Sequence, residues 1–135
     1  MSIIFTVPGR ISGKERPRFG RGRTYTPAKT AKMEAVVKQF GAAAMMGGPP
    51  LEGPLSLEID IYLSKPKSWS KKKKDETLWA TGTPDLDNIA KLIGDALQGT
   101  CFANDSQIAA LSIMRRYSVT DTEGTVITIR DARKL

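Results

Sequence analysis

Nine residues, 55–63 (LSLEIDIYL), alternate apolar and polar side chains, and this segment limits the fold of the chain more than any other. A period of two is typical of a β-strand with one face in the core, because successive side chains point to opposite faces. A chain of 135 residues is long enough to bury such a face in one compact domain and too short for two ordinary ones. We therefore expect a single domain, residues 1–135, built around this strand.

Local composition predicts the remaining elements. Thr26 and Pro27 are typical of a helix start, and Gly99 of a helix end. The predicted elements cover residues 2–7 (strand), 27–46 (helix), 84–98 (helix), 107–117 (strand) and 125–130 (strand). The predicted fold is therefore α/β, of the α+β kind: a small mixed sheet of about four strands with two helices, in the order β-α-β-α-β-β.

Two long connections are expected to be surface loops. Residues 8–26 form a strongly basic loop, and residues 64–84 contain prolines, both tryptophans and four consecutive lysines without sustained periodicity. Long loops in small domains commonly serve a functional site. We interpret Trp69 and Trp79 as packing anchors of the second loop rather than as stacking platforms.

Basic side chains dominate residues 10–32, where Glu15 is the one acid, and the whole chain carries a net charge of +7. This favours a polyanionic partner, because Lys and Arg release counterions from phosphate backbones. Phe19 and Tyr25 add rings that can stack on bases. The predicted DNA-binding residues are Arg16, Arg18, Arg21, Arg23, Lys71, Lys72 and Lys73. The alternatives are a solvated basic face for the arginines and a solvated turn or helix start for the lysines.

Two features of the composition narrow the chemistry. The sequence has no histidine, which excludes Ser-His-Asp and Cys-His pairs, histidine-ligated zinc and a histidine general base. Its single cysteine, Cys101, cannot form an intramolecular disulfide, and we interpret it as a small, partly buried apolar residue. Catalysis would therefore rely on carboxylates, lysines and a hard metal ion.

Nothing in the sequence predicts a membrane partner. No apolar run approaches the roughly 20 residues that a membrane helix needs. The first residues, MSIIFTVPGR, are too short and too interrupted for a signal peptide. We expect a cytoplasmic protein.

The acidic motif 84–97 (PDLDNIAKLIGDAL) is the densest group of candidate catalytic residues. On a helix that advances ~100° per residue, its apolar side chains gather on one side, opposite Asp87, Lys91 and Asp95. A second acidic motif, 104–108, leads into a strand, so its Asp105 is expected to return beside the helix start.

These residue types suit phosphodiester cleavage. Asp85, Asp87 and Asp105 could hold one or two Mg²⁺ ions, which activate water and neutralise charge in the transition state. Lys91, one turn beyond Asp87, would face the phosphate as a point charge. The alternative is that the aspartates only cap the helix and that Asp87 and Lys91 form an ordinary i, i+4 ion pair.

Several motifs occur together in this chain. They are Arg16–Arg18 (RPR), Thr24–Pro27 (TYTP), Pro66–Lys73 (PKSWSKKK), Pro84–Lys91 (PDLDNIAK), Asp95–Leu97 (DAL) and Asn104–Ile108 (NDSQI). In sequence and order they resemble the motifs of the RusA family of Holliday junction resolvases, and the resemblance covers nearly the whole chain.

The resemblance implies a homodimeric, Mg²⁺-dependent crossover junction endodeoxyribonuclease of DNA recombination and repair, which makes paired, symmetric nicks in four-way junctions. It also implies that Asp85, Asp87 and Asp105 bind the metal and that Lys91 is the functional lysine. Asn104 departs from the family pattern, which commonly has an acid there. Asp95 matches the pattern, and we interpret it as structural.

Two other functions stay open at this point. A Mg²⁺-dependent nuclease with the same site could prefer other branched DNA or RNA. A non-catalytic DNA-binding module would use the basic residues alone, with the aspartates as helix caps.

Overall fold

The computed structural model describes residues 2–135, and its central strand is β4 (Leu55–Leu63). The odd-numbered side chains from Leu55 to Ile61 are buried, while the even-numbered side chains from Ser56 to Tyr62 lie partly exposed on the opposite face. The predicted alternation is therefore confirmed, and it gives the sheet one apolar face and one polar face.

Three further strands complete a mixed sheet. They are β1 (Ser2–Pro8), β5 (Ile108–Tyr117) and β6 (Gly124–Asp131), and the spatial order is β1-β6-β4-β5. Strands β4 and β5 run parallel, whereas β6 is antiparallel to both β1 and β4. The predicted four-stranded mixed sheet is confirmed.

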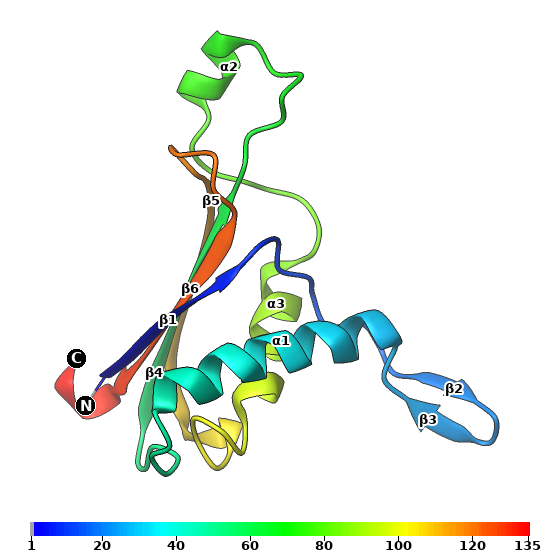
Figure 1. Ribbon diagram of the computed structural model, residues 1–135, viewed down its shortest axis with the longest axis vertical. Helices are drawn as coiled ribbons and strands as arrows, with labels where there is room; N and C mark the ends of the chain where they lie inside the picture. The colour runs from blue at the N-terminus through cyan, green and yellow to red at the C-terminus, as the bar shows by residue number, and fades with distance from the viewer. Residues whose placement is uncertain (1) are drawn as a thin grey trace.

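Two long helices, α1 (Ala28–Met45) and α3 (Leu86–Leu97), pack on the apolar face of the sheet (Figure 1). They approach each other closely at Gly41, where an added Cβ would lie 2.5 Å from a side-chain carbon of Leu97. Strands of the sheet and the two long helices follow the predicted order β-α-β-α-β-β. The result is a single α+β domain in which α3 lies between α1 and strand β5.

The basic connection 8–26 is not a simple loop. It contains two short antiparallel strands, β2 (Arg18–Gly20) and β3 (Arg23–Tyr25). Both residues of the intervening turn, Arg21 and Gly22, have positive φ, as a tight two-residue hairpin turn requires. The hairpin projects from the body of the molecule beside the start of α1 (Figure 1).

The connection 64–84 also contains a regular element, the short helix α2 (Lys71–Glu76), so the expectation of two helices was too low. Ser70 begins it, because its Oγ accepts a hydrogen bond from the Lys73 amide at 3.2 Å. Trp69 packs edge-on against Tyr117 with ring centroids 5.0 Å apart, as expected for a packing anchor. Trp79 is half exposed instead, and the Arg116 guanidinium lies 5.8 Å from its ring centre.

Cys101 is fully buried in the core. Burial raises the pKa of its thiol to about 11, so the side chain stays protonated and behaves as an apolar residue, as predicted. Among the described residues, no helix is both long and apolar enough to cross a membrane.

Candidate active site beside helix α3

Asp85 and Asp87 lie at the start of α3 with exposed side chains. Asp85 occupies the N-cap position, but its side chain makes no capping hydrogen bond. Asp87 lies in the first turn, where the positive end of the helix dipole favours a carboxylate. Capping therefore does not occupy the Asp85 carboxylate, which is available to a ligand.

A groove of about 400 Å³ runs along α3 and brings several of the predicted site residues together. Its polar lining consists of Asp87, Lys91, Asp95 and Asp105, and its apolar floor includes Leu57, Ala90, Ile108 and Leu111. Asp85 is not part of this lining. The expectation that Asp105 returns beside the helix start therefore agrees with the structure for Asp87, whereas Asp85 lies outside the groove.

The charges in this groove are largely uncompensated. The ion pairs found within residues 2–135 include none with Asp85, Asp87, Lys91 or Asp105. The alternative of an ordinary Asp87–Lys91 ion pair is therefore not realised. In the same part of the chain, no three carboxylates lie close enough together to enclose a metal ion by themselves.

Asp105 is held by a short 3₁₀ helix, η1 (Asp105–Gln107). Its amide donates to Oε1 of Gln98, just beyond α3, at 2.9 Å. The preceding Asn104 caps η1 by accepting from the Ser106 amide at 2.9 Å. Asn and Asp are equally good caps, so the Asn104 amide holds this turn as well as a carboxylate would.

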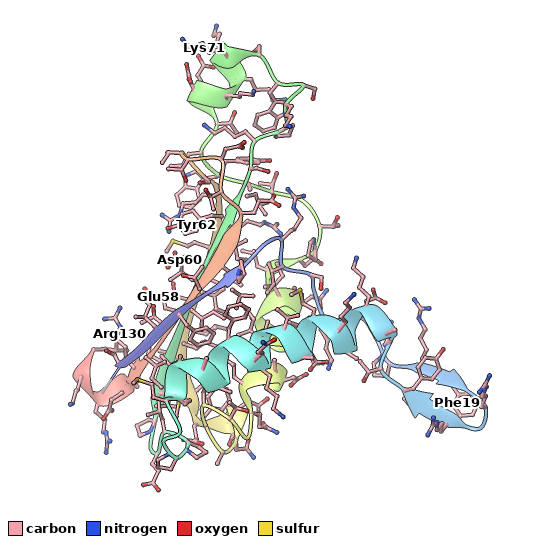
Figure 2. All side chains as sticks on the ribbon, viewed as in Figure 1. Phe19, Glu58, Asp60, Tyr62, Lys71 and Arg130 are labelled. Carbon is pink, nitrogen blue, oxygen red and sulfur yellow. The ribbon has the colours of Figure 1, made fainter. Side chains whose placement is uncertain are left out.

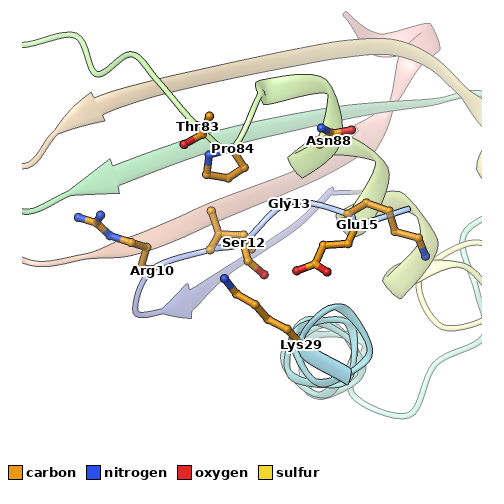
Figure 3. A pocket seen from close by; sticks show the side chains of 10 residues that line it. Arg10, Ser12, Gly13, Glu15, Lys29, Thr83, Pro84 and Asn88 are labelled. Carbon is orange, nitrogen blue, oxygen red and sulfur yellow. The ribbon is translucent and has the colours of Figure 1, made fainter. Parts of the chain in front are cut away.

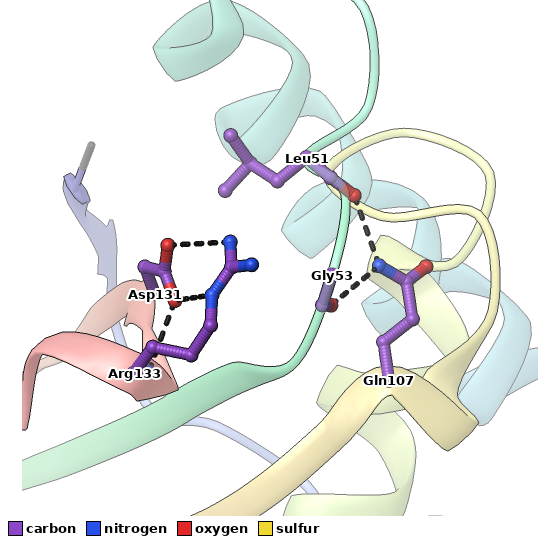
Figure 4. Close-up of polar contacts among 5 residues, drawn as sticks. All are labelled: Leu51, Gly53, Gln107, Asp131 and Arg133. Atoms are coloured by element: carbon purple, nitrogen blue, oxygen red, sulfur yellow. Dashed lines mark hydrogen bonds and ion pairs between the residues drawn. The ribbon is translucent and has the colours of Figure 1, made fainter.

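Gln107 ties this turn to a second loop. Its Oε1 accepts from the amides of Ala103 and Asn104 at 3.0 and 3.1 Å. Its Nε2 donates to the carbonyl oxygens of Leu51 and Gly53 at 3.0 and 3.1 Å (Figure 4). Gln107 thereby fixes the end of the groove that carries Asp105.

Arg115 holds the segment that leads into α3, and the sequence reasoning missed it. It is only 8% exposed, and its guanidinium donates to the carbonyl oxygens of Gly82 at 2.7 Å and Pro84 at 2.5 Å. These bonds hold the segment that leads into Asp85. The sequence cue was a charged residue at a core-facing position of a predicted strand. In the sheet Arg115 lies opposite the buried Ile61 on the neighbouring strand.

Lys14 is a second residue whose role the sequence did not predict. Its Nζ lies 3.1 Å from Glu34 Oε1 on α1 and 3.1 Å from Asp95 Oδ2 on α3. Burial lowers the pKa of Lys14, but the bonds to Glu34 and Asp95 outweigh it and raise the pKa above its ordinary value. This supports the structural interpretation of Asp95, whose charge Lys14 offsets.

The predicted DNA-binding residues lie in two protrusions. The hairpin residues Arg18, Arg21 and Arg23 and the preceding Arg16 are exposed, and Phe19 is 76% exposed beside them. Lys71, Lys72 and Lys73 are exposed on α2. Figure 2 shows Phe19 and Lys71 in separate projections, one beside the start of α1 and one beyond an end of the sheet.

The fold and the groove define a small basic α+β protein with exposed carboxylates beside a lysine. Residues 8–130 match the family described as endodeoxyribonuclease RusA. Since the match spans nearly the whole chain, this protein belongs to the RusA family of endodeoxyribonucleases, as the sequence motifs indicated.

A similar protein is the uncharacterized protein YqaN of Bacillus subtilis (strain 168). It is 34% identical to this chain over an alignment of 129 positions, and the aligned parts amount to 86% of this chain and 88% of YqaN. The two proteins are thus similar along most of their lengths.

Proposed function

We propose that this protein is a structure-selective endonuclease that resolves Holliday junctions by paired nicks, in cytoplasmic DNA recombination and repair. The proposal goes beyond family membership in its substrate, its metal ion and its catalytic residues. The observation that carries it is the groove along α3, in which Asp87, Lys91 and Asp105 line one hollow without ion pairs.

The donor set fits Mg²⁺. Carboxylate oxygens are the ligands that this ion prefers, and it keeps several waters while one or two carboxylates and substrate phosphates hold it. Asp87 and Asp105 from the groove, with the uncapped Asp85 at the helix start, would hold the ion. Because no three carboxylates within residues 2–135 lie close enough to enclose the ion by themselves, phosphate oxygens of bound DNA and water would have to complete its coordination. When bound, Mg²⁺ lowers the pKa of its water and neutralises charge on the phosphate.

The protein's own residues would contribute position and charge. Lys91 stands one turn along α3 from Asp87, so its ammonium group would stabilise negative charge that develops on the phosphate oxygens. Asp95 would stay out of the reaction, because Lys14 already binds it. Arg115 and Gln107 would keep the two ends of the site in place through their bonds to backbone oxygens.

DNA binding would use the two basic protrusions. Arg16, Arg18, Arg21 and Arg23 would contact phosphates from the hairpin, and Lys71, Lys72 and Lys73 from α2. Phe19, whose ring is largely exposed, would stack on a base near the branch point. A homodimer would place two identical sites at opposed strands of a nearly two-fold junction.

The test is nicking of a synthetic four-way junction against a linear duplex of the same sequence, with Mg²⁺ and with EDTA. We expect paired nicks in the junction with Mg²⁺, none with EDTA and little cleavage of the duplex. Flap, fork and RNA substrates are included, because preference for one of them would replace the junction with another branched substrate. Junction binding without cleavage under any divalent metal would favour a non-catalytic binding module.

A further inference from the structure

We propose that a pocket on the other side of the α3 start binds a DNA backbone phosphate next to the one that is cleaved. This inference rests on the proposed function for the identity of the ligand. The pocket has a volume of about 570 Å³ and lies between the 10–15 segment, the start of α1 and the start of α3 (Figure 3). Its ligand is a non-bridging phosphate oxygen pair of one nucleotide.

The pocket and the groove share the first turn of α3. Pro84 and Asn88 line the pocket, and Asp87, which lies between them in sequence, lines the groove. A helix with its side chains is only about 10 Å across, so the two hollows are close neighbours. Each nucleotide of a strand carries one phosphate, and a strand in the groove would therefore extend a neighbouring phosphate toward the pocket.

The 10–15 segment, which lines the pocket, is hydrogen-bonded to α3. The Lys14 amide donates to the Asn88 carbonyl oxygen at 2.9 Å. Gly13 permits this approach, because a Cβ there would lie 2.8 Å from Cβ of Pro84. The pocket is consequently fixed relative to Asp87, which a site for a second phosphate of the same strand requires.

Within residues 2–135, one cation in the pocket lining is not neutralised by an ion pair. Arg10 binds Glu123 at 2.6 Å, and Lys14 binds Glu34 and Asp95. The acid in the lining, Glu15, pairs with Arg18. Lys29 has no ion pair within residues 2–135, and its amino group points into the pocket in Figure 3.

Two further features favour an anion. Helix α1 begins beside Lys29, with neither a side-chain cap nor an acidic residue in its first turn, so the positive end of its dipole is not offset. Ser12 in the pocket lining has a buried Oγ without a hydrogen-bond partner in the described chain. A phosphate in the pocket would lie beside the Lys29 ammonium group, and the Ser12 hydroxyl would have to turn toward the pocket to donate to it.

The experiment measures binding of the full-length protein to four-way junctions in EDTA, so that no DNA is cut. Single methylphosphonate linkages, each of which removes one phosphate charge, are scanned along the strands around the crossover. At one position beside the cut we expect the neutral linkage and Lys29→Ala each to weaken binding about tenfold. Together they should weaken binding no more than either alone. The cut itself is located separately, with Mg²⁺ and the wild-type protein.

Controls separate this contact from general electrostatic attraction. Lys32→Ala removes an exposed charge from the same helix outside the pocket. The fold-losses of affinity from Lys32→Ala and from a neutral linkage should therefore multiply at every position. Lys29→Arg should restore binding, and Ser12→Ala should show the same position-specific coupling with a smaller loss. If the losses from Lys29→Ala multiply at every scanned position, the pocket does not hold a phosphate. Failure to nick would instead overturn the proposed function, because the binding cycle needs no cleavage.

Discussion

The groove beside α3 and the β2–β3 hairpin are built in opposite ways. The groove stands on a helix whose inner side chains Ile89, Leu92 and Ile93 are fully buried. The hairpin consists of two strands of three residues that form a sheet of their own. Catalytic groups must be fixed relative to the reacting atoms, whereas attraction between arginines and phosphates tolerates many geometries. This contrast supports the proposed roles, which are chemistry in the groove and DNA capture by the hairpin.

Apart from the aspartates of the site, the largest effect should follow from removing the positive charge in the groove. Lys91→Ala is expected to lower the cleavage rate about 10²-fold, because it removes a charge that acts on the transition state. The affinity for the junction should stay near that of the wild type. Single-turnover cleavage and a binding titration measure the two effects, with Lys38→Ala, an exposed lysine on α1, as the control. Equal losses of rate and affinity would assign Lys91 to binding instead.

The hairpin should give the reverse result. Arg21→Ala combined with Arg23→Ala is expected to weaken junction binding about tenfold. The slope of log affinity against log salt concentration should fall by an amount that corresponds to about two fewer released counterions. The cleavage rate at saturating DNA should not change. Arg130→Ala removes a charge that is already paired with Glu58 and serves as the control. A lower rate at saturation would mean that the hairpin also shapes the active site.

A smaller effect is expected where hydrogen bonds support the groove. Gln107→Ala should lower the free energy of unfolding by about 1–3 kcal/mol, because the carbonyl oxygens of Leu51 and Gly53 lose their donor. Thermal unfolding measures this change, and Gln39→Ala on an exposed part of α1 is the comparison. Unchanged stability in Gln107→Ala would contradict the supporting role of this side chain.

The sequence predicted the parts of the fold that repeat with a regular period. Strand β4 and the long helices carry apolar patterns that burial confirms at Ile59 and Ile93. The hairpin was not predicted, and α2 was considered only as an alternative helix start at the lysines, because elements of three to six residues are too short to show a period. In both segments turn and cap residues, Gly22 and Ser70, are the informative signals.

The candidate site was predictable in its residue types and only partly in its geometry. Helical spacing was enough to place Asp87 and Lys91 together, since residues four apart share a helix face. The return of Asp105 depends on its backbone amide, which donates to the side-chain Oε1 of Gln98, seven residues away in sequence. Arg115 and Lys14 act through partners twenty or more residues away along the chain, so local patterns could not reveal them.

The most direct test of the division between groove and hairpin is Asp87→Asn, measured for junction binding and for Mg²⁺-dependent nicking. Asp121→Asn is the matched control, because this exposed aspartate lies outside the site and its positive φ suits asparagine. We expect Asp87→Asn to bind the junction as the wild type does and to lose paired nicking about 10³-fold. Nicking by Asp87→Asn at the rate of Asp121→Asn would contradict the account.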